Sequence, residues 1–197
     1  MNQGLIVLLN GTSSSGKTSI SMELKNQKEI PFHHLSIDDF FVNYNDFIDA
    51  KFPDIEPTRE VEDVGPILFD PINSVYYATI KLFSEMGLNV IVDTVNDNDK
   101  RFNDFLDLFF DHSILFVGVV CSKEELTRRE LIRGDRMIGL ANSQYDIIYS
   151  FNEYDLEVNT EVLSPAESAE KILSFIKSDQ DYSAFKKLSK REISAKE

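Results

Sequence analysis

Short, continuous runs of apolar residues alternate along this chain with longer segments in which apolar residues recur every three or four positions. Three clear runs cover residues 5–9, 88–92 and 114–120, and two weaker runs cover residues 34–37 and 155–159. Runs that are apolar throughout are typical of strands buried on both faces, and such strands occur in parallel sheets. The pattern therefore predicts a parallel sheet of five strands.

Helical periodicity fills the segments between these runs. The expected helices cover residues 17–27, 64–86, 99–110, 123–133, 144–151 and 165–178. Ser164 and Pro165 fit the N-cap and the first position of the last helix, and Gly87 fits the end of the second. Because strands and helices alternate, we expect an α/β fold with a doubly wound sheet between two layers of helices.

Residues 43–61 depart from this alternation. They contain Pro53, Pro57 and several acids, and aromatic residues gather in and just before them: Phe40, Phe41, Tyr44, Phe47 and Phe52. A loop of this length is usually functional, so one interpretation of residues 40–62 is a segment that covers a substrate. The other is a short helix that packs its phenylalanines into the core, and both interpretations stay open.

Length and composition bound the domain organisation. The 197 residues, of which 42% are apolar and 27% charged, are ordinary for one large globular domain or two small ones. The chain turns polar after Lys177. We therefore expect one domain over residues 1–178, followed at residues 179–197 by a frayed polar helix or tail.

Charge and cysteine content exclude several partners. Twenty Lys and Arg against thirty-four Asp and Glu leave a net charge of −14, which disfavours nucleic acid and anionic membrane surfaces. The single cysteine, Cys121, excludes an internal disulfide, and we interpret it as an inert apolar residue. The first apolar run is too short for a signal sequence or a membrane span. We expect a cytoplasmic protein, either a monomer or a homodimer.

The strongest motif follows the first apolar run. Residues 11–18 fit G-x-x-x-x-G-K-[ST], in which two glycines let backbone N–H groups form a concave nest for phosphate oxygens. The helix that begins near Gly16 adds its positive end, Lys17 reaches the β- and γ-phosphates, and Thr18 supplies a hydroxyl ligand for Mg²⁺. The candidate nucleotide-binding residues are Gly11, Thr12, Ser13, Ser14, Ser15, Gly16, Lys17, Thr18 and Ser19.

Acidic residues follow two other predicted strands. Asp38 and Asp39 come at the end of the second, where one carboxylate can accept the proton of an attacking hydroxyl; strand alternation would send the two to opposite faces. Asp93 ends the third strand in the Walker B arrangement and is a candidate Mg²⁺ ligand. The alternatives are a solvated helix cap for the pair and a loop-capping role for Asp93.

Three arginines have helical spacing. Arg129, Arg133 and Arg136 stand at i, i+4 and i+7, so they share one face if the helix continues that far. With Gly134 and Gly139 as hinges, they would form a flap that neutralises a phosphoryl group and excludes water. The alternative is that they are exposed and pair with Glu125 or Glu130. His33, His34 and His112 lack metal-site spacing, and we expect them at strand edges or on the surface.

Several segments resemble the chloramphenicol phosphotransferases, small P-loop kinases related to shikimate and adenylate kinases. They are the nucleotide loop at residues 11–19, the strand end Ile37-Asp38, Gly65-Pro66, residues 91–93, residues 154–160, and above all Arg129-Glu130 followed by Arg133-Gly134-Asp135-Arg136 and Gly139. The resemblance extends over about residues 5–176. The stretches at residues 40–60 and 96–99 depart from the family's pattern, and they lie where an acceptor would be chosen.

The resemblance implies a three-layer α/β/α P-loop NTPase fold with a small lid at about residues 128–142. It also implies ATP and Mg²⁺, phosphorylation of a hydroxyl group, Asp38 as the base, and Arg133 and Arg136 as lid charges, with Arg129 on the nucleotide. The predicted function is an ATP-dependent kinase of a small hydroxylated antibiotic or metabolite, and the resemblance suggests a role in resistance. The alternatives are an NTPase module that switches a protein partner, and a nucleoside, sugar-nucleotide or shikimate-like kinase.

Overall fold

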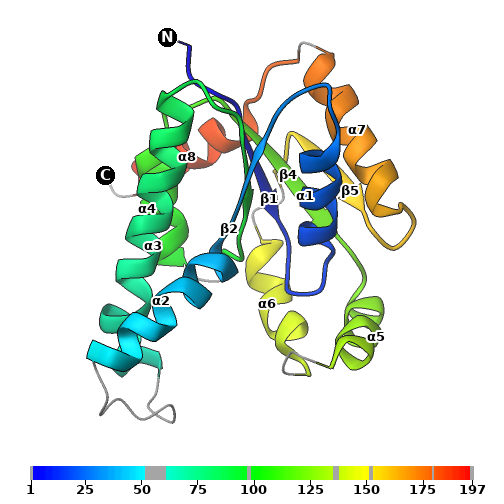
Figure 1. Cartoon of the computed structure of the whole chain (residues 1–197). Helices are drawn as coiled ribbons and strands as arrows, with labels where there is room; N and C mark the ends of the chain where they lie inside the picture. The colour runs from blue at the N-terminus through cyan, green and yellow to red at the C-terminus, as the bar shows by residue number, and fades with distance from the viewer. Residues whose placement is uncertain are drawn as a thin grey trace.

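The computed structural model describes residues 2–51, 61–96, 99–134, 138–150, 153–178 and 180–195 (Figure 1). Its sheet has five strands, which are β1 (Ile6–Asn10), β2 (His33–Ser36), β3 (Val90–Asp93), β4 (Ile114–Val120) and β5 (Leu156–Asn159). Their spatial order is β2-β3-β1-β4-β5 and every pair is parallel. The predicted parallel sheet of five strands is confirmed.

Helices cover both faces of this sheet. They are α1 (Lys17–Asn26), α2 (Ile37–Lys51), α3 (Val61–Glu85), α4 (Asp99–Phe109), α5 (Lys123–Arg133), α6 (Leu140–Ile148), α7 (Pro165–Lys177) and α8 (Ala184–Ala195). Helices α1 and α7 pack on one face, and α3, α4 and α8 pack on the other (Figure 1). The doubly wound three-layer fold is therefore confirmed.

The continuous apolar runs arise from burial on both faces. On β1, Ile6 and Leu8 pack with α3, α4 and α8, whereas Val7 and Leu9 pack with α1 and α7, and all four are fully buried. Successive side chains of a strand point to opposite faces, so a strand between two helical layers needs apolar residues at every position.

The helix ends follow the expected chemistry. Ser164 and Glu167 form a reciprocal capping box at the start of α7, and Pro165 takes its first position. At the end of α3, Gly87 has a φ of 81°, a left-handed conformation that glycine adopts without strain. Helix α6 begins at Leu140, four residues before the sequence placed it, with Gly139 as its N-cap.

The segment that the sequence left open is helical as far as Lys51. Helix α2 begins at Ile37, directly after β2, and Phe40 packs edge-to-face on Tyr76 of α3 with ring centroids 5.1 Å apart. Phe41 contacts Phe69 in the same way at 5.5 Å. Residues 37–51 are therefore helical, while Pro53 and Pro57 lie outside the described residues. A substrate-covering role for residues 40–62 stays a prediction.

The C-terminal segment is a helix, which was one of the two expected alternatives, but this helix is packed on the core and is not frayed. Ala184, Phe185 and Leu188 of α8 belong to the buried core, and Phe185 is 1% exposed against Phe105 and Phe116. The sequence did not predict this packing, because basic residues surround the three apolar positions, which are spaced at i, i+1 and i+4. The carboxylate of Asp155 accepts hydrogen bonds from the first amides of this helix.

Three helices gather at the carboxyl edge of the sheet. Helices α2, α5 and α6 all lie beyond the ends of the strands, at the bottom of Figure 1. Among the described residues, no helix combines the length and the apolar character that a membrane crossing requires. The carboxyl edge is thus where connections between strands and helices leave room for a site.

The packing of α8 predicts that Phe185→Ala lowers the free energy of unfolding by about 3–5 kcal/mol, because it removes a buried aromatic side chain from the core. Urea unfolding followed by circular dichroism measures the change. Lys186→Ala is the matched control, since its side chain is exposed in the same turn, and we expect less than about 0.5 kcal/mol. Equally small changes in both variants would mean that α8 does not belong to the core.

Candidate functional site

The loop at residues 11–16 connects β1 to α1, and its backbone requires glycine at both ends. A Cβ on Gly11 would lie 2.7 Å from the carbonyl oxygen of Val119, so a larger residue would displace β4. Gly16 has a φ of 100° and Ser14 a φ of 61°, both in the left-handed region. Such alternating backbone conformations turn successive N–H groups to one concave side, which is the geometry of an anion nest.

Lys17 lies over this loop and not in solvent. Lys17 is only 6% exposed, and its Nζ donates hydrogen bonds of 2.8 Å to the carbonyl oxygens of Gly11 and Thr12. Gln144 of α6 accepts a 2.9 Å hydrogen bond from the N–H of Ser13. Helix α6 and Lys17 therefore both hold the loop through hydrogen bonds.

Buried hydroxyl groups in the loop are left without a hydrogen-bond partner. Among the described residues, Thr12 Oγ1, Ser14 Oγ and Ser15 Oγ are in this position. Buried polar atoms are nearly always hydrogen-bonded in folded proteins. Thr12 and Ser15 are fully buried, whereas Ser14 is partly exposed, so the hydroxyl of Ser14 is the one that a ligand's acceptor oxygen could satisfy. The loop residues therefore fit a phosphate group.

Asp93 ends β3 beside the loop and is 5% exposed. Burial alone would raise the pKa of its carboxyl, but a hydrogen bond from His34, the charge of Lys17 and a hydrogen bond from Thr18 together hold the pKa below its usual range. The His34 Nε2 to Asp93 Oδ2 distance is 3.3 Å. The structure thus brings together Thr18 and Asp93, the two residues that the sequence singled out as metal ligands.

The ends of β2 and β3 are tied by a residue that sequence reasoning missed. The Tyr76 hydroxyl donates to the carbonyl oxygen of Leu35 at 2.8 Å and lies 3.3 Å from that of Asp93. Complete burial raises the pKa of Tyr76 well above its ordinary value, so the hydroxyl stays a donor. Neither Tyr76 nor His34 carries a local sequence signal, because their roles depend on β2 lying next to β3.

Asp38 and Asp39 stand on a helix, which corrects the expectation that they end a strand. Strand β2 stops at Ser36, and both acids lie in the first turn of α2. Strand alternation therefore does not separate them, and the roughly 100° rotation per helical residue does. Asp38 lines the cavity described next, whereas Asp39 is not among the described residues that line it.

Two cavities meet at the loop. The inner cavity, of about 250 Å³, lies between the loop, α2, α3 and the segment that follows β3. Its wall includes Asp38, Phe41, Phe69, Asn73, Tyr77, Asp93, Asn96 and Arg101. The outer cavity, of about 530 Å³, lies between α1, α5 and the segment after β5. Its wall includes Gly16, Ser19, Arg128, Arg129, Ile132, Thr160, Leu163 and Pro165.

The two cavities share one short stretch of wall. Ser14, Lys17, Thr18 and Arg133 line both of them. Two of these four residues carry a positive charge, and the other two carry hydroxyl groups. We call this stretch the junction.

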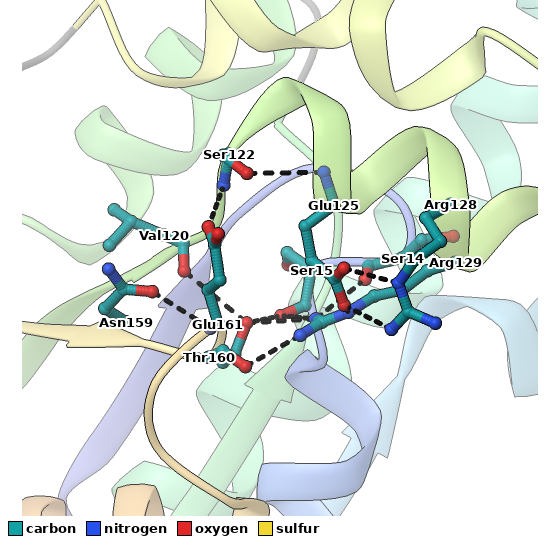
Figure 2. A network of polar contacts seen from close by, with 10 residues as sticks. All are labelled: Ser14, Ser15, Val120, Ser122, Glu125, Arg128, Arg129, Asn159, Thr160 and Glu161. Atoms are coloured by element: carbon teal, nitrogen blue, oxygen red, sulfur yellow. Dashed lines mark hydrogen bonds and ion pairs between the residues drawn. The ribbon is translucent and has the colours of Figure 1, made fainter.

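Arg129 binds the loop to the segment after β5 (Figure 2). Its guanidinium donates to the carbonyl oxygen of Thr160 at 2.7 Å and to the Thr160 hydroxyl at 3.0 Å, and Thr160 Oγ1 donates to the carbonyl oxygen of Ser15 at 2.7 Å. Glu125 accepts from the Nε of Arg129 at 2.9 Å. A planar donor with several N–H groups suits this bridging role better than a lysine would.

The alternative prediction, that the arginines are exposed and pair with Glu125 or Glu130, is confirmed for the pairing of Arg129 with Glu125. Glu125 pairs with Arg128 and Arg129, and their hydrogen bonds lower the pKa of its carboxyl to about 2. Helix α5 ends at Arg133, where Gly134 takes a φ of 69°, so Arg129 and Arg133 share this helix at positions i and i+4. Arg133 nonetheless reaches the junction, while Arg136 lies outside the described residues, and the flap stays a prediction.

Glu130 does not pair with arginine in the way the sequence suggested. It is completely buried, and its two carboxylate oxygens accept hydrogen bonds from the N–H groups of Gly139 at 2.9 Å and Ala141 at 2.7 Å. The carboxylate thereby caps the start of α6. Because α6 carries Gln144, Glu130 also helps to hold the loop, and sequence reasoning missed this role.

His33 and His34 lie on β2, the edge strand of the sheet, as expected, whereas His112 is a correction. His112 is 1% exposed and not at the surface, with its Nδ1 2.8 Å from Asp111 Oδ1, and it precedes β4 at the opposite edge of the sheet. His34 is buried against Asp93, and only His33 is exposed. Within the described residues, no cluster of three or more His, Cys, Asp or Glu residues could hold a metal ion. Cys121 is buried, and burial raises the pKa of its thiol, as expected for an inert apolar residue.

Comparison with known proteins identifies a family whose sequence pattern this chain matches. The sequence model of the family described as "Chloramphenicol phosphotransferase-like protein" matches residues 4–177. Relatives from two strains of Mycobacterium tuberculosis, each named "Putative O-phosphotransferase", are 31% identical over 207 aligned positions, which cover 98% of this chain and 92% of theirs. The resemblance drawn from the motifs is confirmed.

Solved structures with this fold include several kinases. The Mycobacterium tuberculosis APS kinase CysC, in complex with AMPPNP and APS, matches with a TM-score of 0.63 at 16% identity over 90% of this chain and 99% of its own. A Sinorhizobium meliloti gluconokinase matches with a TM-score of 0.56 at 16% identity, over 90% and 94%. The Deinococcus radiodurans tunicamycin resistance protein matches with a TM-score of 0.60 at 10% identity, over 88% and 96%. At these identities the likeness concerns the fold.

The anchoring of α6 by Glu130 predicts that Glu130→Ala leaves two buried amides without an acceptor and lowers the free energy of unfolding by about 3 kcal/mol. Amide hydrogen exchange measures the local effect, and we expect the amides of Gly139 and Ala141 to lose protection. Glu124→Ala, exposed on the same helix, is the control and should change stability by less than about 1 kcal/mol. Unchanged protection of both amides in Glu130→Ala would contradict the anchor.

Proposed function

The chain belongs to the chloramphenicol phosphotransferase-like family, and from this premise we propose that it transfers the γ-phosphoryl group of ATP to a hydroxyl group of a small acceptor. One observation carries the proposal: the outer and inner cavities meet at Ser14, Lys17, Thr18 and Arg133. A kinase needs a donor site and an acceptor site that open onto one phosphoryl position, and the junction supplies such a position.

The outer cavity suits the nucleotide. Ile132, Leu163 and Pro165 offer apolar surface for a base, and the Arg129 guanidinium stands beside them. From there the phosphates would run along loop 11–16, where the backbone N–H groups and the unpaired hydroxyls of Ser14 and Ser15 lie. Lys17 would then exchange its hydrogen bonds to the loop carbonyls for the β- and γ-phosphates.

Mg²⁺ would be held by Thr18 and Asp93. The two side chains are hydrogen-bonded to each other, and the lowered pKa of Asp93 keeps its carboxylate ionised, which fits a cation that prefers oxygen ligands and few protein carboxylates. When bound, Mg²⁺ would neutralise phosphate charge at the junction. His34 would orient the Asp93 carboxylate by donating to its Oδ2.

The inner cavity suits the acceptor. Asp38 would accept the proton of the attacking hydroxyl or orient it, while Phe41, Phe69 and Tyr77 provide an apolar and aromatic wall for the acceptor's body. Arg133 would stabilise the charge on the transferring phosphoryl group, with Arg136 as its predicted companion. Water in this position would compete as the acceptor, so an acceptor that fills the inner cavity also limits hydrolysis.

An NTPase module that switches a protein partner is the second candidate from the sequence. Such a module needs the outer cavity but no enclosed space beside the phosphoryl position. The inner cavity, with a carboxylate and three aromatic side chains on its wall, supports a small acceptor instead. A nucleoside, a sugar nucleotide and chloramphenicol itself are all acceptors of the proposed kind.

The two neighbouring acids provide the sharpest test of the proposed base. Asp38→Asn should lower the rate of phosphoryl transfer at least about 100-fold, because it removes the proton acceptor but leaves the nucleotide site unchanged. Asp39→Asn is the matched control and should change the rate less than about threefold, since Asp39 lies on the same turn without lining the cavity. Lys17→Met should weaken both transfer and nucleotide binding.

ADP release across a panel of hydroxylated antibiotics and metabolites, chloramphenicol included, measures transfer, and titration calorimetry measures nucleotide affinity. Slow turnover of ATP that rises when an acceptor is added is the expected result. Full transfer by Asp38→Asn would remove Asp38 as the base. Rapid ATP hydrolysis that no small hydroxyl compound stimulates would argue for the NTPase module.

A further inference from the structure

The wall of the inner cavity carries the cation of Arg101 and the side-chain amide of Asn96, whose Nδ2 has no hydrogen-bond partner. We propose that the acceptor bears an anionic oxygen group, such as a carboxylate, sulfate or phosphate, which Arg101 and Asn96 bind inside the inner cavity. The inference rests on the proposed function, since it identifies the class of acceptor that the same site would take. It makes Arg101 and Asn96 specificity-determining residues.

Asn96 gives the first observation. It lies three residues after Asp93, is 4% exposed and lines the inner cavity. Its side-chain Nδ2 is buried and has no hydrogen-bond partner in the structure. An unpaired buried N–H group is costly, and a ligand oxygen at this place would satisfy it. Asn96 therefore calls for a hydrogen-bond acceptor in the cavity.

Arg101 gives the second, independent observation. It stands in the first turn of α4 and lines the same cavity, with its guanidinium carbon 5.4 Å from the centre of the Phe69 ring. That contact holds the planar group against the aromatic wall. A guanidinium binds carboxylate, sulfate and phosphate oxygens through two parallel hydrogen bonds, which a neutral acceptor cannot match.

The positive charge of Arg101 belongs to one cavity of a protein that is strongly acidic as a whole. The net charge of −14 would repel an anion at long range, but exposed charges beyond about 8 Å are largely screened at physiological salt. The groups on the cavity wall therefore decide, and they include the carboxylates of Asp38 and Asp93 as well as the cations of Lys17, Arg101 and Arg133. Lys17 and Arg133 at the junction face the transferred phosphate in the proposed reaction, whereas Arg101 lines the inner cavity outside the junction.

The rest of the wall restricts the acceptor's body. Phe41 and Phe69 meet edge-to-face, and Tyr77 lies two helical turns after Phe69 on α3. Burial raises the pKa of Tyr77 to about 12, so its hydroxyl stays neutral beside Arg101. The site thus suits a hydroxylated compound with an apolar or aromatic body and an anionic group, and a neutral compound such as chloramphenicol should be a poor acceptor.

Matched pairs of acceptors test the inference on the unaltered chain. Aromatic hydroxy acids are each compared with their neutral methyl amides, with ADP release as the readout. We expect kcat/KM to be about 10–100-fold higher for the acids, which is the effect of a charge-assisted hydrogen-bond pair. Preference for the amides, or equal use of both, overturns the inference while transfer itself upholds the proposed function.

A substitution of Arg101 tests whether this residue causes the preference for anionic acceptors. Arg101→Gln should raise KM for the acids about 10-fold or more, with little change in kcat and none in KM for the amides. Lys100→Gln, its neighbour on α4 but outside the inner cavity, is the control and should leave both unchanged. Arg101→Lys, which keeps the charge without the planar fork, should show an intermediate KM.

The outcomes separate the two proposals. If the chain binds ATP but phosphorylates neither acids nor amides, the proposed function fails, and this inference falls with it. If acids are used and Arg101→Gln matches the unaltered chain in KM, the anionic acceptor stands, but its assignment to Arg101 is overturned. Thermal unfolding of each variant shows whether it is folded, and the acid–amide comparison needs no variant.

Discussion

The parallel register of three neighbouring strands brings loop 11–16, Asp38 and Asp93 to one edge of the sheet. Asp93 pairs with Ser36 of β2 on one side and with Leu9 of β1 on the other, so the three strands end at one level of the sheet. Loop 11–16, Asp93 and the first turn of α2 leave the sheet side by side as a result. A shift of one residue in β3 would turn the Asp93 side chain to the opposite face and separate it from Thr18.

Local sequence patterns predicted most of the fold, because two-sided burial leaves continuous apolar runs and helix capping leaves recognisable residues. The strand β4 and the helix α5 begin and end where the sequence placed them. Helix α8 was misjudged because three core residues among lysines look like a solvated helix until α4 and β4 are in place beside it. Helix α2 was ambiguous for the same reason, since Phe40 and Phe41 find their partners on α3.

The residues of the candidate site also fall into two groups, those that local sequence patterns predicted and those that depend on the folded structure. Loop 11–16 was visible because its backbone geometry demands glycines at fixed spacing, and Asp93 was visible because it ends an apolar run. His34 was not, since it acts only through Asp93, which folding brings near. Arg129 bridges Thr160 and loop 11–16, and Glu130 bridges α5 and α6, so both residues stabilise the surroundings of the loop. The expected contact of Arg129 with the nucleotide stays a prediction.

These hydrogen bonds matter for the junction, because the proposed transfer of a phosphoryl group between the two cavities requires that their shared wall keeps a fixed position. The most direct measurement is a crystal structure with Mg²⁺ and a non-hydrolysable ATP analogue. The account predicts the base in the outer cavity and the terminal phosphate at the junction, in contact with Lys17 and Arg133 and facing Asp38. A terminal phosphate that lies away from the inner cavity, or a base inside that cavity, would contradict it.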